Sequence, residues 1–288
     1  MSQVAIVTDS VASLPENIIE ELDIHWVPYY IHRGKEIWRD LVSIDRATFY
    51  QWMTNASEIP KTANPSPSDY AQAYQEIADS GISEIVSIHI TSKGSGAYQA
   101  ARIAREMLLE HLPDLKIEVI DSLNVSMCQG WMVIEAARAA LAGASFEAVV
   151  AKVKAMIPIT QMLQTADTLK YLYMGGRIGR AQHLMGSILN VKPIIGMREG
   201  VITSLGQARS RNRVYQLMID KIENAVGSMG KIKIAYVHAA AQDEIQKLKD
   251  LADERLNIVE SLIAELSPAL GVHTGPGTAG MCYFLVSD

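Results

Sequence analysis

Few features of this sequence point to a disulfide-stabilised, metal-binding or membrane-spanning protein. Its 288 residues include only two cysteines, Cys128 and Cys282, each in an apolar segment, so no disulfide framework or cysteine-based metal site is expected. No run approaches the roughly 18 uncharged apolar residues that a membrane-spanning helix needs. Residues 1–9 lack the basic stretch and long apolar core of a secretory signal. We therefore expect a cytoplasmic protein with reduced thiols and no stable membrane insertion.

Charge and composition argue against several further classes. The formal net charge is −6 and no nucleic-acid reading motif is present, so a nucleic-acid partner is not expected. Charged residues make up 20% of the chain and hydrophobic residues 49%, which argues against disorder and allows a sizeable core. Since 288 residues exceed the usual length of one domain, we expect two domains.

Strand-like and helical patterns alternate in the first half of the chain. Three apolar runs are each followed by a helical pattern, which is typical of parallel βαβ units. Residues 13–16 and 66–69 each predict a capping box at the start of a helix. Residues 26–42 contain aromatic residues and an Arg33-Gly34-Lys35 turn, and they predict a hairpin. The three apolar runs span residues 4–7, 84–90 and 116–121.

The second half of the chain has a more mixed order. Two strands around Arg198-Glu199-Gly200 predict an antiparallel hairpin. We predict an α/β fold with two domains. The N-terminal α/β domain, residues 1–160, has a mostly parallel sheet with helices on both faces, and the smaller C-terminal domain, residues 161–288, is a mixed-sheet α/β domain. The other elements expected in the second half are helices from about residue 211 and at 242–254, and strands at 232–237, 258–264 and 281–286.

The most informative polar loop is Thr91-Ser92-Lys93-Gly94-Ser95-Gly96, between a predicted strand and a predicted helix. Ligands of α/β sheets collect at the carboxyl ends of strands, where the free N–H groups of a helix N-terminus attract anions. The glycines let the backbone approach a ligand, and Ser95 adds a hydroxyl donor. An ordinary glycine turn with an N-cap serine explains the loop equally well. The loop matches no dinucleotide-binding, P-loop or hydrolase-elbow motif.

Two further polar loops carry candidate ligand-binding residues. In residues 61–67, Ser66 is better explained as a helix cap, whereas Thr62 lies ahead of the turn and is explained less well in this way. In residues 271–277, three glycines and a proline surround His273 and give its backbone a special shape. The other histidines do not stand at a metal-ligand spacing from a cysteine or an acid, so no metal site is expected.

Two basic segments complete the candidate features. Residues 175–180 form a flexible, positive turn that contains Arg177. Arg209, Arg211 and Arg213 lie close together in the sequence with no acid among them. A solvated charged surface is the simpler explanation for both segments.

Several short motifs, each a weak signal alone, follow one another in a characteristic order. They are Thr8-Asp9-Ser10 with Leu14-Pro15, Val27-Pro28, Thr62 with Pro65-Ser66, Ser95-Gly96 with Tyr98-Gln99, Asp121-Ser122, Gly175-Gly176-Arg177-Ile178, and His273 with Gly275-Pro276-Gly277. In this order and spacing they resemble the DegV family over essentially the whole chain. The resemblance implies a two-domain α/β fold that holds a long-chain fatty acid in a buried tunnel, without a cofactor. Some members carry the substrate of a bacterial fatty-acid kinase, whose separate ATP-binding subunit phosphorylates the carboxylate for phospholipid synthesis.

The resemblance also implies roles for individual residues. Thr62 and Ser95 are expected to hydrogen-bond the carboxylate, with the Gly96 N–H and His273 close by. Asn64 and the basic turn that contains Arg177 are expected in the vicinity of the head-group. Arg209 resembles a position used to dock the kinase subunit.

The chain departs from the family pattern beside both hydroxyls. It has Thr62-Ala63-Asn64-Pro65-Ser66 where the family commonly has Thr-Ser-Gln-Pro-Ser, and Ser95-Gly96-Ala97 where Ser-Gly-Thr is common. The hydroxyls are retained, so fatty-acid binding is still expected. Each buried CH₂ of a fatty-acid tail contributes about 0.8 kcal/mol. The buried carboxylate then needs hydrogen-bond partners, because desolvating it alone is unfavourable.

The sequence leaves one enzymatic alternative open. Ser95 as nucleophile and His273 as base would make a serine hydrolase or acyltransferase acting on acyl esters, since such residues can meet in a fold although far apart in sequence. No acidic third member or oxyanion hole is evident. We therefore expect a lipid-binding protein that presents its ligand to a partner and is not itself an enzyme.

Overall fold

The computed structural model describes residues 4–56, 58–185, 191–227 and 229–286, and its first half forms a parallel sheet of four strands. The strand order is β2-β1-β6-β7, and each neighbouring pair is parallel. Strands covered on both faces read as nearly continuous apolar runs, which is why these were recognisable in the sequence. They are β1 (Val4–Asp9), β2 (Ile24–Val27), β6 (Glu84–His89) and β7 (Lys116–Asp121).

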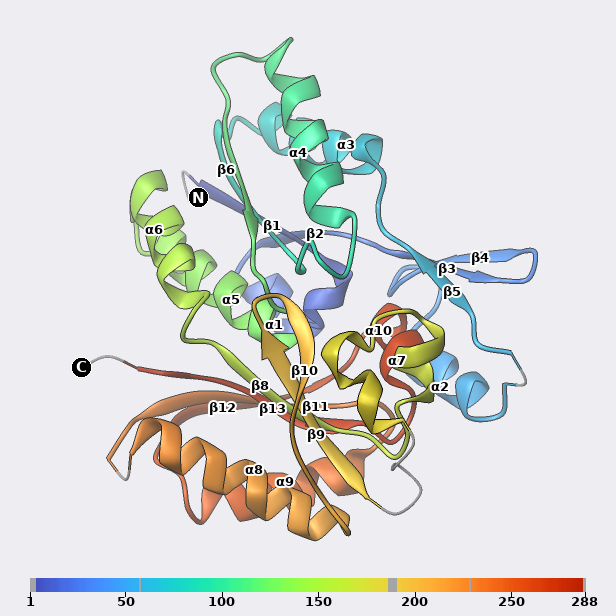
Figure 1. The fold of residues 1–288 in the computed structure, drawn as a ribbon. Coiled ribbons are helices and arrows are strands. Elements are labelled where there is room, and N and C mark those ends of the chain that lie inside the picture. Colours follow the sequence, from blue (N-terminus) through green and yellow to red (C-terminus); the bar gives the residue numbers. More distant parts are fainter. Residues whose placement is uncertain (1–3, 57, 186–190, 228, 287–288) are drawn as a thin grey trace.

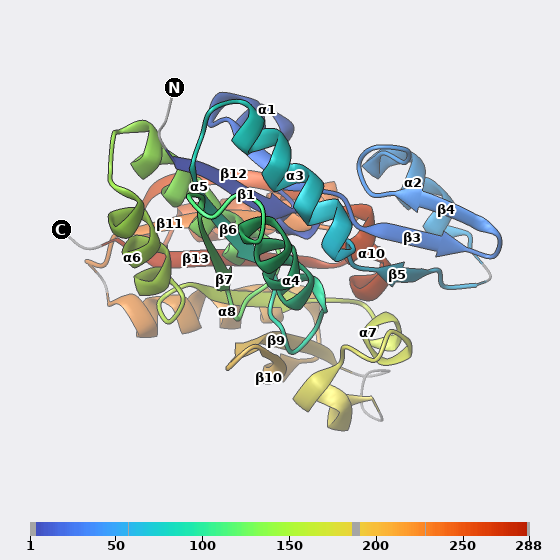
Figure 2. The same cartoon turned by 90° about the horizontal axis from the view of Figure 1, so that it is seen from above.

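Helices cover both faces of the parallel sheet, as predicted (Figures 1 and 2). On one face, α3 (Pro67–Asp79) packs against α4 (Ala97–Leu109). On the other face, α5 (Met127–Leu141) packs against α6 (Phe146–Met156). The side chains of α5 are buried almost all round, because this helix also touches the second sheet. The Trp131 indole lies edge-on to Phe284 at 5.7 Å and donates a hydrogen bond to the Cys282 carbonyl.

The second half of the chain forms a mixed sheet in the order β10-β9-β8-β13-β11-β12. β11 and β12 pair in parallel, and the other neighbours are antiparallel. The hairpin predicted around residues 198–200 is confirmed as β9 and β10. Helices α8 (Arg211–Val226) and α9 (Gln242–Asp253) cover the outer side of the sheet (Figure 1). The strands are β8 (Gln161–Thr165), β9 (Lys192–Arg198), β10 (Val201–Ala208), β11 (Ile232–His238), β12 (Ile258–Glu265) and β13 (Ala279–Leu285).

A small antiparallel sheet in the order β4-β3-β5 projects from the body and positions Thr62 (Figures 1 and 2). The predicted hairpin is confirmed for β3 and β4, and its turn contains Gly34 with a φ of 57°. β5 pairs with β3, which places Thr62 opposite Ile31. The elements concerned are β3 (Tyr30–Arg33), β4 (Glu36–Arg39), β5 (Lys61–Ala63), and the neighbouring helices α2 (Arg46–Thr54) and α10 (Pro268–Thr274).

One continuous hydrophobic core joins the two larger sheets. It runs from Val4 in β1, through α5, to Phe284 in β13. The strands of the two sheets fall on either side of residue 160, but the core is shared across that point, so the division into domains there stays a prediction. Over the part of the chain that the structure describes, no helix is both long and apolar enough to cross a membrane.

Both predicted helices begin where expected, but only one of the two predicted capping boxes is formed. Ser13 does not cap the helix that follows Pro15; it has a φ of 56°, and its hydroxyl accepts a hydrogen bond from Ser267 N at 3.0 Å. This long-range partner overrides the local capping signal. Ser66 does cap α3: its Oγ accepts from Asp69 N at 3.2 Å, and Asp69 Oδ2 accepts from Ser66 N at 2.7 Å. The elements near Ser13 are the 3₁₀ helix η1 (Ser10–Ala12) and α1 (Glu16–Glu21).

Candidate functional site

A cavity of about 370 Å³ lies where the parallel sheet, the mixed sheet and α10 meet. Its volume falls within the range of small-molecule sites. Many of its polar residues come from the loops that the sequence singles out, and its apolar residues come from β8, β9, α7 (Lys170–Met174), α10, η1 and the end of β6. The polar lining includes Tyr29, Thr62, Asn64, Ser95, Arg177 and His273. The apolar lining includes Val11, Ile90, Met162, Leu172, Met197 and Leu270.

Thr62 and His273 are brought together although 211 residues separate them: Thr62 Oγ1 lies 2.7 Å from His273 Nε2. Thr62 is carried by β5 and His273 by the last turn of α10. The contact therefore depends on the packing of α10 against the small sheet. With Nε2 protonated, His273 donates to Thr62 Oγ1, and the threonine proton is left for a ligand oxygen.

His273 is an electrically neutral group in this site. Burial, and secondarily the positive charge of Arg177, lowers the pKa of His273 from 6.5 to about 4. None of the described residues offers its Nδ1 a hydrogen bond. This nitrogen lies against Gly175, where an added Cβ would come within 2.3 Å of it. His273 therefore acts through shape and hydrogen bonding, not through charge.

Ser95 has a partner that the sequence did not reveal. The Tyr29 hydroxyl lies 2.5 Å from Ser95 Oγ, which also accepts a hydrogen bond from Ala97 N at 3.2 Å. Burial raises the pKa of Tyr29 well above its ordinary value, so the phenol keeps its proton. With Tyr29 as donor, Ser95 accepts twice and its own O–H is free for a ligand. Only the position of Tyr29 after Val27-Pro28 hinted at this role.

Gly96 and Asn64 meet at the start of α4. Gly96 is the N-cap of that helix, and a Cβ added to it would come within 2.9 Å of Asn64 Oδ1. The missing side chain thus lets two loops approach each other. Asn64 Nδ2 donates to the Pro65 carbonyl at 2.8 Å. Asn64 therefore lies beside the loop that contains Ser95 and Gly96, and its amide is occupied by its own turn.

Arg177 connects the basic turn to the loop that carries Ser95. This exposed side chain donates from Nε to the Gly94 carbonyl at 3.2 Å and from Nη1 to the Gly175 carbonyl at 2.6 Å. Of the described residues, Lys93 and Arg177 are the charged ones that line the cavity. Their positive charge favours an anionic ligand group. Arg177 lies between α7 (Lys170–Met174) and the 3₁₀ helix η2 (Gly179–Leu184).

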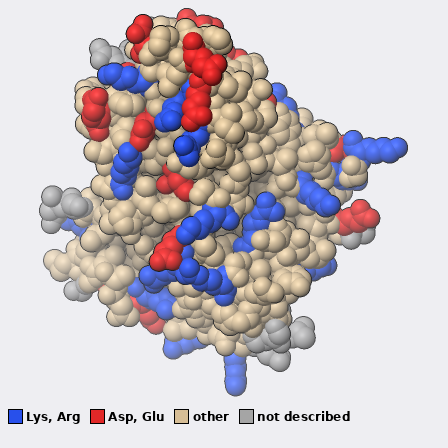
Figure 3. Space-filling view, turned by 45° about the horizontal axis from the view of Figure 1, so that its top comes forward, with Lys and Arg blue, Asp and Glu red and all other residues tan. Residues whose placement is uncertain are grey.

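The surface around this region is unevenly charged. Figure 3 shows Lys and Arg side chains gathered across the middle and lower part of one face, while Asp and Glu side chains concentrate at its upper end. A chain with a net charge of −6 therefore still presents a locally positive surface. Such unevenness governs encounter with charged ligands and partners more than it governs fold.

The expected loop around His273 is partly a helix. Residues 268–274 form α10, which begins at Ser267, whose hydroxyl accepts from Leu270 N, with Pro268 in the first turn. Gly275, with a φ of 76°, ends it. The sequence carried this signal, because serine followed by proline is a typical helix start and glycine a typical end. The prediction of a loop was wrong, because it relied on the glycines around His273 and overlooked the helix start at Ser267-Pro268.

The arginine cluster is not unopposed, which corrects a second expectation. Arg211 forms an ion pair with Asp167 at 3.0 Å and lies 3.8 Å from Glu244. These acids are remote in sequence, so they escaped notice. Arg209 and Arg213 are exposed at the start of α8. The docking role expected for Arg209 stays a prediction.

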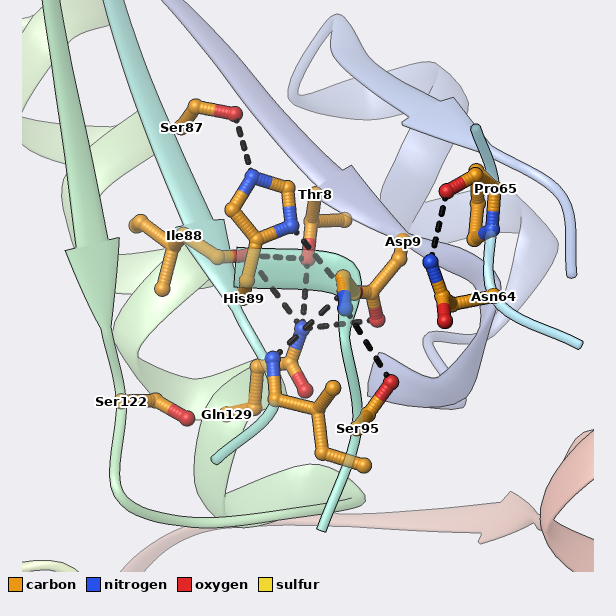
Figure 4. A network of polar contacts seen from close by, with 12 residues as sticks. Thr8, Asp9, Asn64, Pro65, Ser87, Ile88, His89, Ser95, Ser122 and Gln129 are labelled. Carbon is orange, nitrogen blue, oxygen red and sulfur yellow. Dashed lines mark hydrogen bonds and ion pairs between the residues drawn. The ribbon is translucent and has the colours of Figure 1, made fainter. Parts of the chain in front are cut away.

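A Ser-His-Asp chain does exist in this protein, and Figure 4 shows it within a buried network of polar contacts. His89 Nδ1 lies 3.1 Å from Asp9 Oδ2, and His89 Nε2 lies 2.7 Å from Ser87 Oγ. All three side chains are buried, and they are not among the described residues that line the cavity. Tyr74 donates to Ser87, and Gln129 of α5 donates to Asp9. This network joins the parallel sheet to the helices on both its faces.

The Ser95–His273 pair of the enzymatic alternative is not formed. Ser95 is hydrogen-bonded to Tyr29, and His273 to Thr62. A general base must lie within hydrogen-bond reach of its nucleophile, or be linked to it by one water. This arrangement gives the hydrolase alternative no direct support.

An α/β protein with a parallel and a mixed sheet, and a partly open cavity lined by polar loops and apolar side chains, belongs to a recognisable class. The chain belongs to the DegV family, because the family model described as "Uncharacterised protein, DegV family" matches residues 3–286. A DegV domain-containing protein of Caldanaerobacter subterraneus is 31% identical over 283 residues, which cover 98% of this chain and 99% of that protein.

Solved structures from this family have the same fold. A DegV family protein from Thermus thermophilus, described for its fatty acid binding, is 29% identical with a TM-score of 0.91, covering 99% of this chain and 100% of that one. A stearic acid-binding protein from Eubacterium ventriosum is 28% identical with a TM-score of 0.88, covering 99% of this chain and 98% of that one.

Proposed function

We propose that this protein binds one long-chain fatty acid in the cavity and presents its carboxylate to an ATP-binding fatty-acid kinase subunit. The observation that carries the proposal is the composition of the cavity: an extensive apolar lining, together with the hydroxyls of Thr62 and Ser95 and the imidazole of His273. Similar proteins described as fatty-acid-binding support the first part. The kinase part rests on resemblance to the family.

The tail supplies most of the affinity in this proposal. Met162, Leu172, Met197 and Leu270 line the cavity and offer a polarisable, adaptable apolar surface. Each CH₂ buried against it contributes about 0.8 kcal/mol. A chain of many such groups therefore binds tightly without strong head-group contacts.

The head-group end orients the ligand. The Ser95 O–H is free to donate when Tyr29 donates to Ser95, and the Thr62 O–H is free when His273 donates to Thr62. Both hydroxyls then point protons at one carboxylate. Hydrogen bonds to an ionised group are roughly twice as strong as neutral ones. The helix start at Gly96 adds the positive end of the α4 dipole.

Presentation of the carboxylate to a partner requires that the part of the cavity near His273 and Arg177 lie close to the surface. Arg177 is exposed and lies at the same end of the cavity as His273, whose pKa its charge lowers. The protein itself performs no chemistry in this proposal; the kinase subunit transfers the phosphoryl group from ATP to a carboxylate oxygen, and we place the pair in the cytoplasm.

The test is to denature the purified protein in organic solvent and identify the released lipid by mass spectrometry. We expect about one fatty acid per chain. Met197→Trp should lower this occupancy, because a larger side chain fills the cavity. Met229→Trp, at an 83% exposed position, is the matched control and should keep full occupancy. Absence of lipid, together with no displacement of a fluorescent fatty acid, would refute the proposal.

A further inference from the structure

Ser126 lines the cavity and carries a buried hydroxyl without a hydrogen-bond partner among the described residues. The residue is 2% exposed. Across the described part of the chain, no residue gives its Oγ a hydrogen bond. Leaving such a group unpaired is unfavourable, so native proteins satisfy nearly all of them. The hydroxyl therefore points to a ligand group.

The backbone of Ser126 makes the same point independently. Its φ of 57° and ψ of −146° fall in a region that glycine adopts readily and other residues do not. Holding a side chain there costs on the order of 1–3 kcal/mol. The fold therefore tolerates a strained backbone at a serine that lines the cavity.

The hydroxyl is not used to cap the helix that follows. Ser126 is the N-cap residue of α5, yet its side chain makes no capping hydrogen bond. A serine cap ordinarily stabilises a helix by about 1 kcal/mol. Ser126 does not provide this stabilisation, because its hydroxyl forms no hydrogen bond to the N–H groups of α5. What remains is a free O–H beside the first N–H groups of a helix of 15 residues. The positive end of the helix dipole favours an oxygen acceptor at this place.

A second polar group interrupts the apolar wall from the other sheet. Gln164 of β8 is 3% exposed and lines the same cavity. Within the described residues, its side-chain amide makes no hydrogen bond. A plain hydrocarbon tail would leave both Ser126 and Gln164 unpaired, and unpaired polar groups discriminate strongly between ligands that differ by one hydroxyl.

Ser126 belongs to a different loop from Ser95. Ser126 follows β7, whereas Ser95 follows β6, the neighbouring strand of the parallel sheet. The two loops are tied together by a hydrogen bond from Thr91 N to the Asn124 carbonyl at 2.9 Å. One ligand can therefore reach both regions.

We propose that Ser126 and the N-terminus of α5 form a second polar subsite, which binds a hydroxyl group carried on the acyl chain. The preferred ligand class is then a hydroxy fatty acid. A ligand hydroxyl accepts from Ser126 and has its own proton left to donate. This inference rests on the proposed function and specifies its ligand.

The test compares octadecanoic acid with its monohydroxy isomers in a fluorescence displacement assay. The hydroxyl is placed near the carboxylate, in the middle of the chain or near the methyl end. We expect the parent protein to bind one of these isomers roughly three- to tenfold more tightly than the plain acid. Ser126→Ala should erase this preference and leave the affinity for the plain acid unchanged.

Two further variants make the test specific. Ser126→Gly should also erase the preference, and it should raise the midpoint temperature of unfolding because the strained backbone is relieved. Thr165→Val is the matched control: Thr165 has a buried hydroxyl without a partner among the described residues, but it does not line the cavity. This variant should keep the preference.

The outcomes separate the subsite from the function on which it rests. If the parent binds the plain acid and prefers no hydroxy isomer, the subsite is refuted and the proposed function stands. A preference that survives in Ser126→Ala also refutes the subsite. If no acid of any kind binds, the proposed function itself fails.

Discussion

The Tyr29 hydroxyl lies 2.5 Å from Ser95 Oγ, which joins the chain after β2 to the loop after β6. Tyr29→Phe removes this hydrogen bond but keeps the buried ring. Without the Tyr29 donor, the Ser95 hydroxyl is no longer oriented to donate its proton to the ligand. We expect fatty-acid affinity to fall about three- to tenfold with little change in stability. Isothermal titration calorimetry measures this.

Tyr30→Phe is the matched control for this prediction. Tyr30 donates to Asp69 Oδ1 at 3.0 Å at the start of α3, and it is not among the described residues that line the cavity. Its substitution should leave fatty-acid affinity unchanged. Equal effects in the two variants would contradict the role given to Tyr29.

His273 should make the protein less stable in mild acid. Its pKa in the folded state is about 4, against 6.5 for an ordinary histidine, because it is buried and lies near Arg177. The unfolded chain thus takes up a proton as the pH falls through 6.5, whereas the folded protein does so only near 4. This contribution is complete above pH 6.5, and up to about 3 kcal/mol is lost as the pH falls to 4. Urea unfolding of parent and His273→Gln across this range should show a shallower loss in the variant; parallel curves would contradict the assignment.

Asp40 should act in the opposite direction. Burial raises the pKa of Asp40 from 3.8 to about 6, although hydrogen bonds from Ser10 and Ala269 oppose the shift. The folded protein therefore binds this proton more tightly than the unfolded chain, and stability is gained as the pH falls from 6 toward 3.8. Asp40→Asn should remove this gain, so its unfolding free energy should fall more steeply with acid than that of the parent. An unchanged slope would mean that Asp40 does not titrate in this range.

The two cysteines should be unreactive in the folded protein. Burial, followed by the neighbouring Cys282, raises the pKa of the Cys128 thiol well above its ordinary value, and reactivity requires the thiolate. Iodoacetamide should modify neither thiol in native protein and both in denaturant, as counted by intact mass. Rapid alkylation of the native protein would show that the contact between α5 and β13 opens readily.

Arg209 is the residue to test for kinase docking. Arg209→Glu should lower kinase turnover at limiting protein concentration and leave fatty-acid binding intact, because charges at the rim of an interface govern association. Arg213→Glu, an exposed position in the same region, is the control for charge alone. Equal kinase turnover with Arg209→Glu and with the parent would count against a docking role. Equal losses of turnover in Arg209→Glu and Arg213→Glu would show that the total charge of this region matters, and not a specific contact of Arg209.

Local patterns in the sequence predicted most of the fold. The buried strand runs, the Ser66 capping box and the hairpins β3–β4 and β9–β10 depend on residues close together in the chain. Thr62, Ser95 and His273 were likewise singled out from their loops, and resemblance to the DegV family tied them to one head-group. The structure does bring them to one cavity.

The features that the sequence missed depend on distant partners. Tyr29 contacts Ser95, which is 66 residues away in the sequence, and Arg211 forms an ion pair with Asp167 in the loop after β8. The sequence around Ser13 predicted a helix cap, but in the structure its hydroxyl accepts a hydrogen bond from the backbone N–H of Ser267, 254 residues away. Such pairings arise only when the sheets pack, so no local signal encodes them. The unpaired hydroxyl of Ser126 belongs to the same group.

The central claim is that Thr62 and Ser95 hold the carboxylate of a fatty acid. Its most direct test is to measure the affinities of a fatty acid and its methyl ester for the parent, Thr62→Ala and Ser95→Ala. Each substitution removes one charge-assisted hydrogen bond of about 1.5–3 kcal/mol, so acid affinity should fall roughly ten- to hundredfold. The ester should bind the parent less tightly and respond far less to either substitution. An unchanged fatty-acid affinity in both variants would contradict the account. If the parent and Thr62→Ala hydrolyse the ester and Ser95→Ala does not, the result would favour the hydrolase instead.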